Sequence, residues 1–318
     1  MSNQIRDIIR GAMFGVAVGD ALGAPLEFMS AESIQQQYGT VREMVGGGWL
    51  NVRPGEFTDD TQMTLAVAHG IVDSPSNPVE AIGRYFVKWY NGKPKDVGAT
   101  CANSIYNAIC AARQKQKPTK SDWSRAAKVT HNAMNGKSAG NGSLMRTAYV
   151  GLYYQNIDEV CNNARAISKM THFDDGAAKD CAAYSAALSR MVETESLDAR
   201  LDVIIDCTER DGRYFFDALS SYFFNPNPTG YVIDSFAAAL HCIYTTRSFE
   251  EAVVKAVNLG GDADTIGAIT GGLAGAIYGY TAIPNRWIDC ISPDDFAEIS
   301  FLCDAAEAAR QPENCDRA

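Results

Sequence analysis

The sequence has no excess of basic residues and no closely spaced pair of cysteines. Its 318 residues carry 28 Lys and Arg against 38 Asp and Glu, a net charge of −10. We expect no nucleic-acid partner, because proteins that bind the phosphate backbone carry basic faces. The nine cysteines form no C-x-x-C pair, which argues against a zinc site, and their odd number argues against a disulfide framework. Reduced thiols in a cytoplasmic protein are the simplest prediction.

The sequence also lacks the pattern of a signal peptide and a clear membrane segment. Asp7 and Arg10 interrupt the apolar stretch that a signal peptide would need. The stretch 265–285 carries no charge and is long enough to cross a bilayer. It is rich in glycine and lacks basic flanks, so we predict a buried helix there and no membrane span.

Few segments alternate with period two, and we find no internal repeat and no linker. Apolar residues recur instead at helical spacing, and the 46% hydrophobic content allows a substantial core. We therefore predict a single all-α domain over residues 1–318, with a core at about 5–290 and a loose tail beyond 312. The predicted helices include 5–23, 78–91, 101–113, 157–170, 176–193, 197–210, 233–244 and 249–258.

Two segments carry a glycine at every fourth position, which places the glycines on one helix face. They are residues 11, 15, 19 and 23, and residues 267, 271, 275 and 279. Each glycine costs about 1 kcal/mol of helix stability relative to alanine, which a packing gain must offset. We infer two central, tightly packed helices that contact each other.

The segment 262–265, Asp-Ala-Asp-Thr, precedes an apolar helix. Acidic side chains at a helix start offset the helix dipole and cap free N–H groups, so for this motif alone a cap is the favoured interpretation. The same oxygens could bind Mg²⁺ or Mn²⁺. A similar motif, Thr-Asp-Asp-Thr at 58–61, begins another helix. Carboxylates that meet without a cation would repel each other. From the residues alone, two interpretations are equally supported. The motifs are either two independent helix caps or the two halves of one site that binds two metal ions.

Two further features are ambiguous from the residues alone. The segment 140–143, Gly-Asn-Gly-Ser, could be a nest of N–H groups at a helix start, which suits phosphate, or a plain turn. His172 lies in a predicted loop, where it could be a site residue, a cap or a surface residue.

In combination, several segments resemble the ADP-ribosylglycohydrolase family. They are, in order, 19–28, 57–61, 140–146 and 258–267, and the resemblance spans roughly residues 8–288. It implies a compact, orthogonal all-α domain whose central cleft holds two divalent cations, Mg²⁺ or Mn²⁺. The metal ligands implied by position are Thr58, Asp59, Asp60, Asp262, Asp264 and Thr265.

The resemblance also implies residues that contact the substrate or act in catalysis. The implied substrate-binding residues are Gly140, Asn141, Gly142 and Ser143 for the diphosphate, His172, and Gly230 and Tyr231 on the adenine side. Glu27 and Asp60 are both candidates for proton transfer, and the sequence does not rank them. Asp96 resembles the carboxylate that arginine-directed members bring to the guanidinium.

The expected activity is removal of ADP-ribose from modified arginines of a target protein. An aspartate opposite a guanidinium makes a charge-assisted contact that a serine-linked substrate cannot use. One alternative is hydrolysis of serine-linked or O-acetyl ADP-ribose. Another is an immunity-type protein that occludes a cognate ADP-ribosyltransferase, for which the acidic surface and the glycine-rich loop 46–55 leave room.

Overall fold

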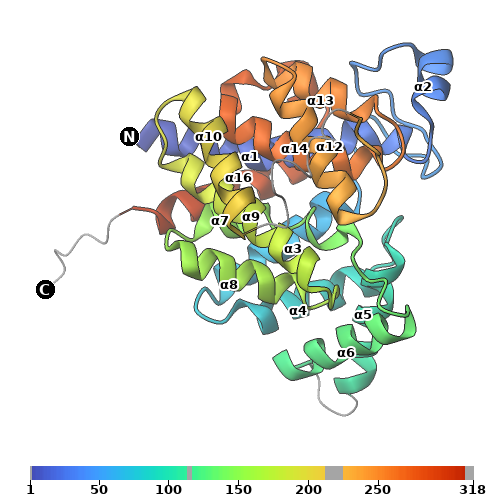
Figure 1. Cartoon of the computed structure of the whole chain (residues 1–318), viewed down its shortest axis with the longest axis vertical. Helices are drawn as coiled ribbons and strands as arrows, with labels where there is room; N and C mark the ends of the chain where they lie inside the picture. Colours follow the sequence, from blue (N-terminus) through green and yellow to red (C-terminus); the bar gives the residue numbers. More distant parts are fainter. Residues whose placement is uncertain (1, 113–116, 212–224, 312–318) are drawn as a thin grey trace, which may run out of the picture.

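The computed structural model describes residues 2–112, 117–211 and 225–311 (Figure 1). Within these ranges the chain forms helices joined by loops, and its β-pairing is limited to isolated bridges. This confirms the all-α prediction. The predicted loose tail beyond residue 312 lies outside the described residues.

The helices of the described residues are, in chain order, as follows. The first group is α1 (Ser2–Gly23), η1 (Ala24–Leu26), α2 (Ala31–Tyr38), α3 (Asp59–Asp73), α4 (Pro78–Asn91) and α5 (Ala99–Ala112). The middle group is α6 (Lys120–Ala133), η2 (Asn141–Ser143), α7 (Ala148–Tyr153), α8 (Ile157–Ser168), α9 (Asp175–Val192) and α10 (Leu197–Asp211). The last group is α12 (Val232–Tyr244), α13 (Phe249–Val257), α14 (Ala263–Tyr278), η3 (Tyr280–Ala282), α15 (Asn285–Ile288) and α16 (Pro293–Ala309). The predicted helices all occur, with ends shifted by a few residues.

Helices α1 and α14 lie side by side in the centre of the molecule (Figure 1). A Cβ atom built on Gly15 would lie 2.1 Å from the carbonyl oxygen of Gly271, and one on Gly19 would lie 2.0 Å from that of Gly267. The two glycine faces therefore meet backbone to backbone, in antiparallel register, as the glycine spacing predicted. The uncharged stretch 265–285 was predicted to form one buried helix. Helix α14 instead ends at Tyr278, because Gly279 has a φ of 85°, which does not continue a helix.

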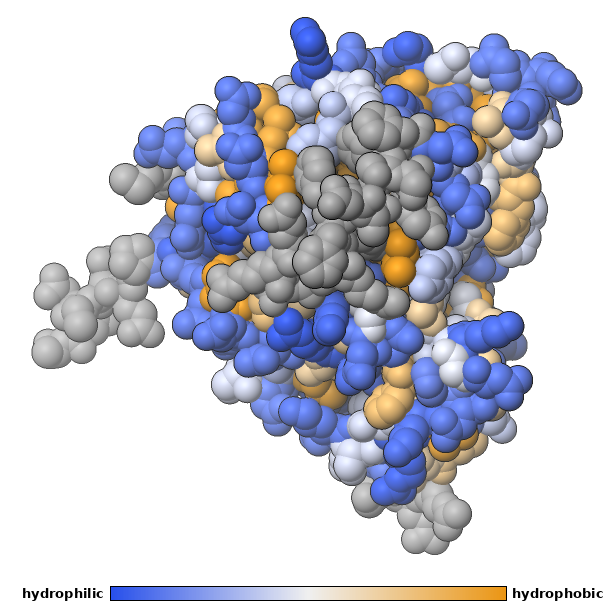
Figure 2. Space-filling model, in the orientation of Figure 1, coloured by the Kyte–Doolittle hydropathy of each residue, from blue (hydrophilic) through white to orange (hydrophobic). Residues whose placement is uncertain are grey.

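One helical segment, Asn3–Leu26, is long and apolar enough to cross a membrane, but 94% of its apolar window is buried inside the protein. That burial is typical of a core helix, and the structure gives no support for a membrane span. On the face shown in Figure 2, hydrophilic residues cover most of the coloured surface. The apolar side chains of the helices instead form one large core around α1, α9 and α14.

Candidate active site

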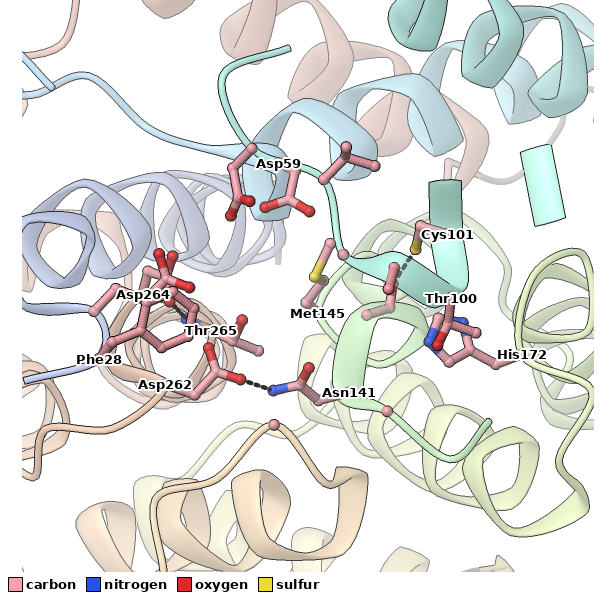
Figure 3. A pocket seen from close by; sticks show the side chains of 18 of the residues that line it. Phe28, Asp59, Thr100, Cys101, Asn141, Met145, His172, Asp262, Asp264 and Thr265 are labelled. Atoms are coloured by element: carbon pink, nitrogen blue, oxygen red, sulfur yellow. Dashed lines mark hydrogen bonds between the residues drawn. The ribbon is translucent and has the colours of Figure 1, made fainter. Parts of the chain in front are cut away.

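A cleft of about 400 Å³ brings together segments from both ends of the chain. One wall is formed by the loop after α1 and by the first residues of α3 and α14. The other is formed by the start of α5, the 140–142 turn and the loop before α9. Figure 3 shows Asp59, Asp262 and Asp264 on one side of this space and His172 on the other. Most of the residues predicted for the site line it.

The two acidic motifs begin α3 and α14, and they meet. The hydroxyl of Thr265 donates to Asp60 Oδ2 at 3.3 Å, although 205 positions separate the two residues. The N-cap residues Thr58 and Asp262 make no capping bond through their side chains within the described chain. Capping accounts for only part of these motifs: Asp264 accepts a hydrogen bond from the backbone N–H of Thr265 at 2.8 Å, whereas the contact between Asp60 and Thr265 joins the two helix starts.

Asp20, near the end of α1, holds the start of α3 in place. Its carboxylate accepts hydrogen bonds from the backbone N–H groups of Thr58 and Thr61 at 2.9 and 3.0 Å, and from their hydroxyls at 2.8 and 2.6 Å. Burial raises the pKa of Asp20 to about 6, and these four bonds limit the rise. Sequence reasoning gave Asp20 no role. The available signal was an acid within the apolar, glycine-lined second half of α1, residues 11–23.

The carboxylates of the two helix starts are buried and close to one another. Burial, followed by the charges of neighbouring carboxylates, raises the pKa of Asp59, Asp60 and Asp264 well above the usual range. Asp60 Oδ1 is buried without a hydrogen-bond partner among the described residues. An orphaned carboxylate oxygen within a cluster of acids is a costly arrangement for a protein alone. These donors fit a hard divalent cation, which prefers oxygen ligands.

Glu27 and Asp96 join the same cluster from two separate loops. One carboxylate oxygen from each, and one from Asp264, lie within 4.8 Å of one another. Burial raises the pKa of Glu27 to about 8, with smaller contributions from neighbouring acids. Burial also raises the pKa of Asp96, although hydrogen bonds with the backbone of Val97 and with Asp59 oppose the rise. Asp96 therefore lies beside the predicted metal ligands. Its predicted role, contact with the substrate guanidinium, did not require a position this close to them.

Asn141 connects the opposite wall to the acidic cluster. Its side-chain amide donates to Asp262 Oδ2 at 2.7 Å (Figure 3) and to Ser235 Oγ at 2.8 Å. Its backbone N–H donates to the carbonyl of Gly230 at 3.0 Å. The segment forms a 3₁₀ turn, η2, and not the start of an α-helix. It aligns Gly140 and Gly142 along the cleft.

His172 lines the cleft beside Gly140 and Gly142. Burial, assisted by the charge of Arg146, lowers its pKa to about 3, so the imidazole is neutral at physiological pH. Its Nδ1 lies 2.7 Å from the hydroxyl of Thr171. This placement supports a site residue over a cap or a surface residue.

Arg146 lies behind the wall of the cleft that carries His172 and bonds to two of its segments. Its guanidinium is fully buried and donates to the carbonyl of Gly142 at 3.0 Å and to the hydroxyl of Thr171 at 2.7 Å. It therefore connects the 140–142 turn to the loop that carries His172. The sequence analysis included Arg146 in a family-like segment without a role of its own.

Four predicted site residues do not line the cleft directly. Thr58 and Asp60 lie just behind it within the first turn of α3. Ser143 is buried, and its hydroxyl accepts a hydrogen bond from Ser168 at 3.0 Å, on the core side. Tyr231 is 42% exposed, and its backbone pairs with Gly140 in an isolated bridge.

The all-α fold agrees with comparisons to known proteins. A family model for ADP-ribosylglycohydrolase matches residues 1–315, and the chain belongs to this family. A solved structure, an "ADP-ribosylglycohydrolase-related protein complex", superposes with a TM-score of 0.78 at 30% identity, covering 97% of this chain and 100% of that chain.

Curated relatives carry more specific names. The chain is 32% identical over 306 residues to ADP-ribosyl-[dinitrogen reductase] glycohydrolase of Rhodospirillum rubrum, covering 95% of this chain and 96% of the relative. It is 29% identical to ADP-ribosylarginine hydrolase Tri1 of Serratia proteamaculans, covering 89% and 75%. It is 24% identical to ADP-ribosylhydrolase ARH3 of Mus musculus, covering 92% and 89%. Hydrolysis of ADP-ribose glycosidic linkages is thus the activity of this family.

Proposed function

We propose that the protein is a divalent-cation-dependent hydrolase that removes ADP-ribose from modified arginine side chains. The observation that carries the proposal is the meeting of the two acidic helix starts at Asp60 and Thr265, with Glu27 and Asp96 beside them in one cleft. The name of the Serratia relative, an ADP-ribosylarginine hydrolase, supports the choice of linkage.

Two Mg²⁺ or Mn²⁺ ions would be held by the oxygens of the two helix starts. The proposed ligands are Thr58, Asp59, Asp60, Asp262, Asp264 and Thr265. When bound, the cations supply Lewis-acid stabilisation and lower the pKa of water. Asp20 supports this set from behind, because it fixes the backbone of the first turn of α3.

In the proposed reaction, water adds to the anomeric carbon of the distal ribose while the N-glycosidic bond to the guanidinium breaks. The cleft carboxylates stabilise the positive charge that develops on the ribose ring. Glu27 lines the cleft, whereas Asp60 lies behind it with one oxygen bonded to Thr265. We therefore assign proton transfer to Glu27, whose raised pKa lets it hold a proton near neutral pH.

The remaining walls fit the two other parts of the substrate. Gly140, Gly142 and neutral His172 would border the diphosphate, where backbone N–H groups can approach closely. Asp96 is partly accessible in the cleft next to Asp59. It would form a charge-assisted contact with the guanidinium of a modified arginine.

The test is release of ADP-ribose from arginine-, serine- and acetyl-linked substrates, assayed side by side with Mg²⁺ or Mn²⁺. We expect wild-type activity on the arginine linkage and a loss of at least about 100-fold in the Asp262→Asn, Asp264→Asn double variant. Asp73→Asn, at the surface end of α3, is the control and should retain activity. Undiminished turnover by the double variant would exclude the proposed cation site.

Asp96→Asn tests the linkage separately. The neutral amide cannot form an ion pair with a guanidinium, so activity on the arginine linkage should fall by about tenfold or more. An equal loss on every linkage would show that Asp96 acts within the carboxylate cluster and does not select arginine.

A further inference from the structure

A closed loop, here called the Gly46–Glu56 loop, packs against both segments that bring single carboxylates to the cleft. Gly46, Gly47 and Gly48 all have positive φ values, from 65° to 93°. Gly47 and Val52 pair through two backbone hydrogen bonds of 2.7 and 2.9 Å. The glycine-rich sequence thus forms a defined turn that presents Trp49 at its tip.

On one side, this loop holds the segment that carries Glu27. The indole Nε1 of Trp49 donates to Glu27 Oε2 at 2.7 Å. The Trp49 ring lies against Phe28, with the ring centroids 5.6 Å apart. A Cβ atom built on Gly48 would lie 2.7 Å from Pro25 Cα, so the loop backbone touches the same segment.

On its other side, the loop holds the segment that carries Asp96. Lys95 Nζ lies 2.7 Å from Glu56 Oε1 and donates to the carbonyl of Asn51 at 3.5 Å. Glu56 in turn accepts a hydrogen bond from the backbone of Arg53 at 2.8 Å. The loop therefore contacts the segments next to Glu27 and next to Asp96, two cleft carboxylates that do not lie in α-helices.

Trp49 is 56% exposed, so burial of its ring does not explain its position. Its polar contact is the hydrogen bond from the indole Nε1 to Glu27 Oε2 at 2.7 Å. Phe28 has a φ of 64°, a conformation that non-glycine residues rarely adopt. The backbone next to Glu27 is held by the bond from the Phe28 N–H to the carbonyl of Gly261 at 2.7 Å, whereas the hydrogen bond from Trp49 reaches the Glu27 side chain itself.

We propose that Trp49 is a positioning residue, whose indole N–H holds the Glu27 carboxylate in the orientation needed for proton transfer. This inference rests on the proposed function only in the role given to Glu27, and it does not depend on which ADP-ribose linkage is cleaved. An exposed aromatic residue on a loop would then affect turnover with little effect on stability.

The test is Trp49→Phe, which keeps an aromatic ring and removes the N–H donor. We expect kcat to fall about tenfold, with KM changed less than about twofold and the melting temperature unchanged. Trp89→Phe is the matched control, because it removes an indole bond of the same length, 2.7 Å to Gln62 Oε1, outside this cleft. Its kcat should match the wild type.

A double-mutant cycle shows whether Trp49 acts through Glu27. In a Glu27→Gln background, Trp49→Phe should lower the residual single-turnover rate by less than about twofold. A further tenfold loss in that background, or an unchanged kcat in Trp49→Phe alone, would overturn the inference. All variants are assayed on whichever linkage the wild type hydrolyses, so an error in the arginine assignment leaves this test intact.

Discussion

The hydroxyl of Thr265 reaches Asp60 at 3.3 Å, and this contact joins the first turns of α14 and α3. Because the two residues come from opposite ends of the chain, the acidic cluster exists only after the whole domain has folded. The carboxylates of Asp59, Asp60 and Asp264 then lie at backbone positions fixed by helix starts, and Asp20 supports the start of α3. Preorganised charge of this kind can act on a substrate without rearrangement.

Replacing Asp20 by alanine should disturb the site without removing any residue from the cleft lining. Four donors from Thr58 and Thr61 would lose their acceptor, at a cost of about 1–3 kcal/mol. We expect lower unfolding free energy, weaker Mg²⁺ or Mn²⁺ binding and a loss of activity of at least about tenfold, measured by denaturation, titration calorimetry and turnover.

The control is Asp122→Ala. Asp122 is also a buried aspartate, but it lies in the first turn of α6, where it forms a capping box with Thr119. It should destabilise α6 by about 1 kcal/mol and leave kcat unchanged. Full activity in Asp20→Ala would mean that the first turn of α3 needs no support from α1.

The contact between α1 and α14 should tolerate no side chain. Helix propensity alone favours Gly271→Ala by about 1 kcal/mol. The new Cβ atom, however, would lie 2.0 Å from the carbonyl oxygen of Gly15. Overpacking on this scale costs about 3 kcal/mol, so steric overlap outweighs propensity.

Chemical denaturation measures this effect. Gly98→Ala is the stability control, because no described atom lies within 4 Å of its Cβ position, and its unfolding free energy should change by less than about 0.5 kcal/mol. A Gly271→Ala protein as stable as the wild type would show that the two helices can separate freely.

Without divalent cations, the protein should lose stability as the pH rises. Burial raises the pKa of Glu27 to about 8 and that of Asp20 to about 6, whereas both groups ionise near pH 4 in the unfolded chain. The folded state therefore binds more protons than the unfolded state between about pH 4 and 8. Stability consequently falls as the pH rises through this window.

The measurement is the melting temperature in EDTA at pH 6 and pH 8, repeated with Mg²⁺ or Mn²⁺. We expect a lower value at pH 8 in EDTA, and a smaller or reversed difference with the cation, because cations favour ionised carboxylates. A melting temperature that rises from pH 6 to 8 in EDTA would contradict the buried acidic cluster.

His172 should remain neutral across the working pH range. Burial and the nearby Arg146 lower its pKa to about 3. The ¹⁵N shifts of its imidazole, assigned by comparison with His172→Gln, should therefore stay constant from pH 5 to 8. A titration with a midpoint near 6.5 would instead indicate that the imidazole is exposed to solvent.

Local patterns in the sequence were sufficient for most of the longer helices and for both acidic motifs. The glycine spacing predicted the contact between α1 and α14, because residues four apart share a helix face whatever the tertiary structure. The motifs at 58–61 and 262–265 indicated a possible metal site through residue type alone. Helices α2, α6, α7, α15 and α16 lie outside the predicted set. In α6, the charged and polar residues of Lys120–Ala133 obscure the apolar face.

The roles of supporting residues could not be predicted, because they depend on contacts between distant segments. Asp20 is 38 positions from Thr58, and Trp49 is 22 positions from Glu27. Arg146 bonds to Thr171 from 25 positions away. No periodicity or motif spacing encodes such pairs, and each became visible only in the folded chain.

The glycine contact between α1 and α14 has a consequence for how this protein can vary. The facing positions of the two helices have no room for a Cβ atom. Sequence change in α1 and α14 is therefore restricted to the faces that point away from each other, whereas the surrounding helices are free of this constraint. Engineers who seek new substrates should vary cleft-lining positions other than Glu27, Trp49 and Asp96, and should leave this pair of helices untouched.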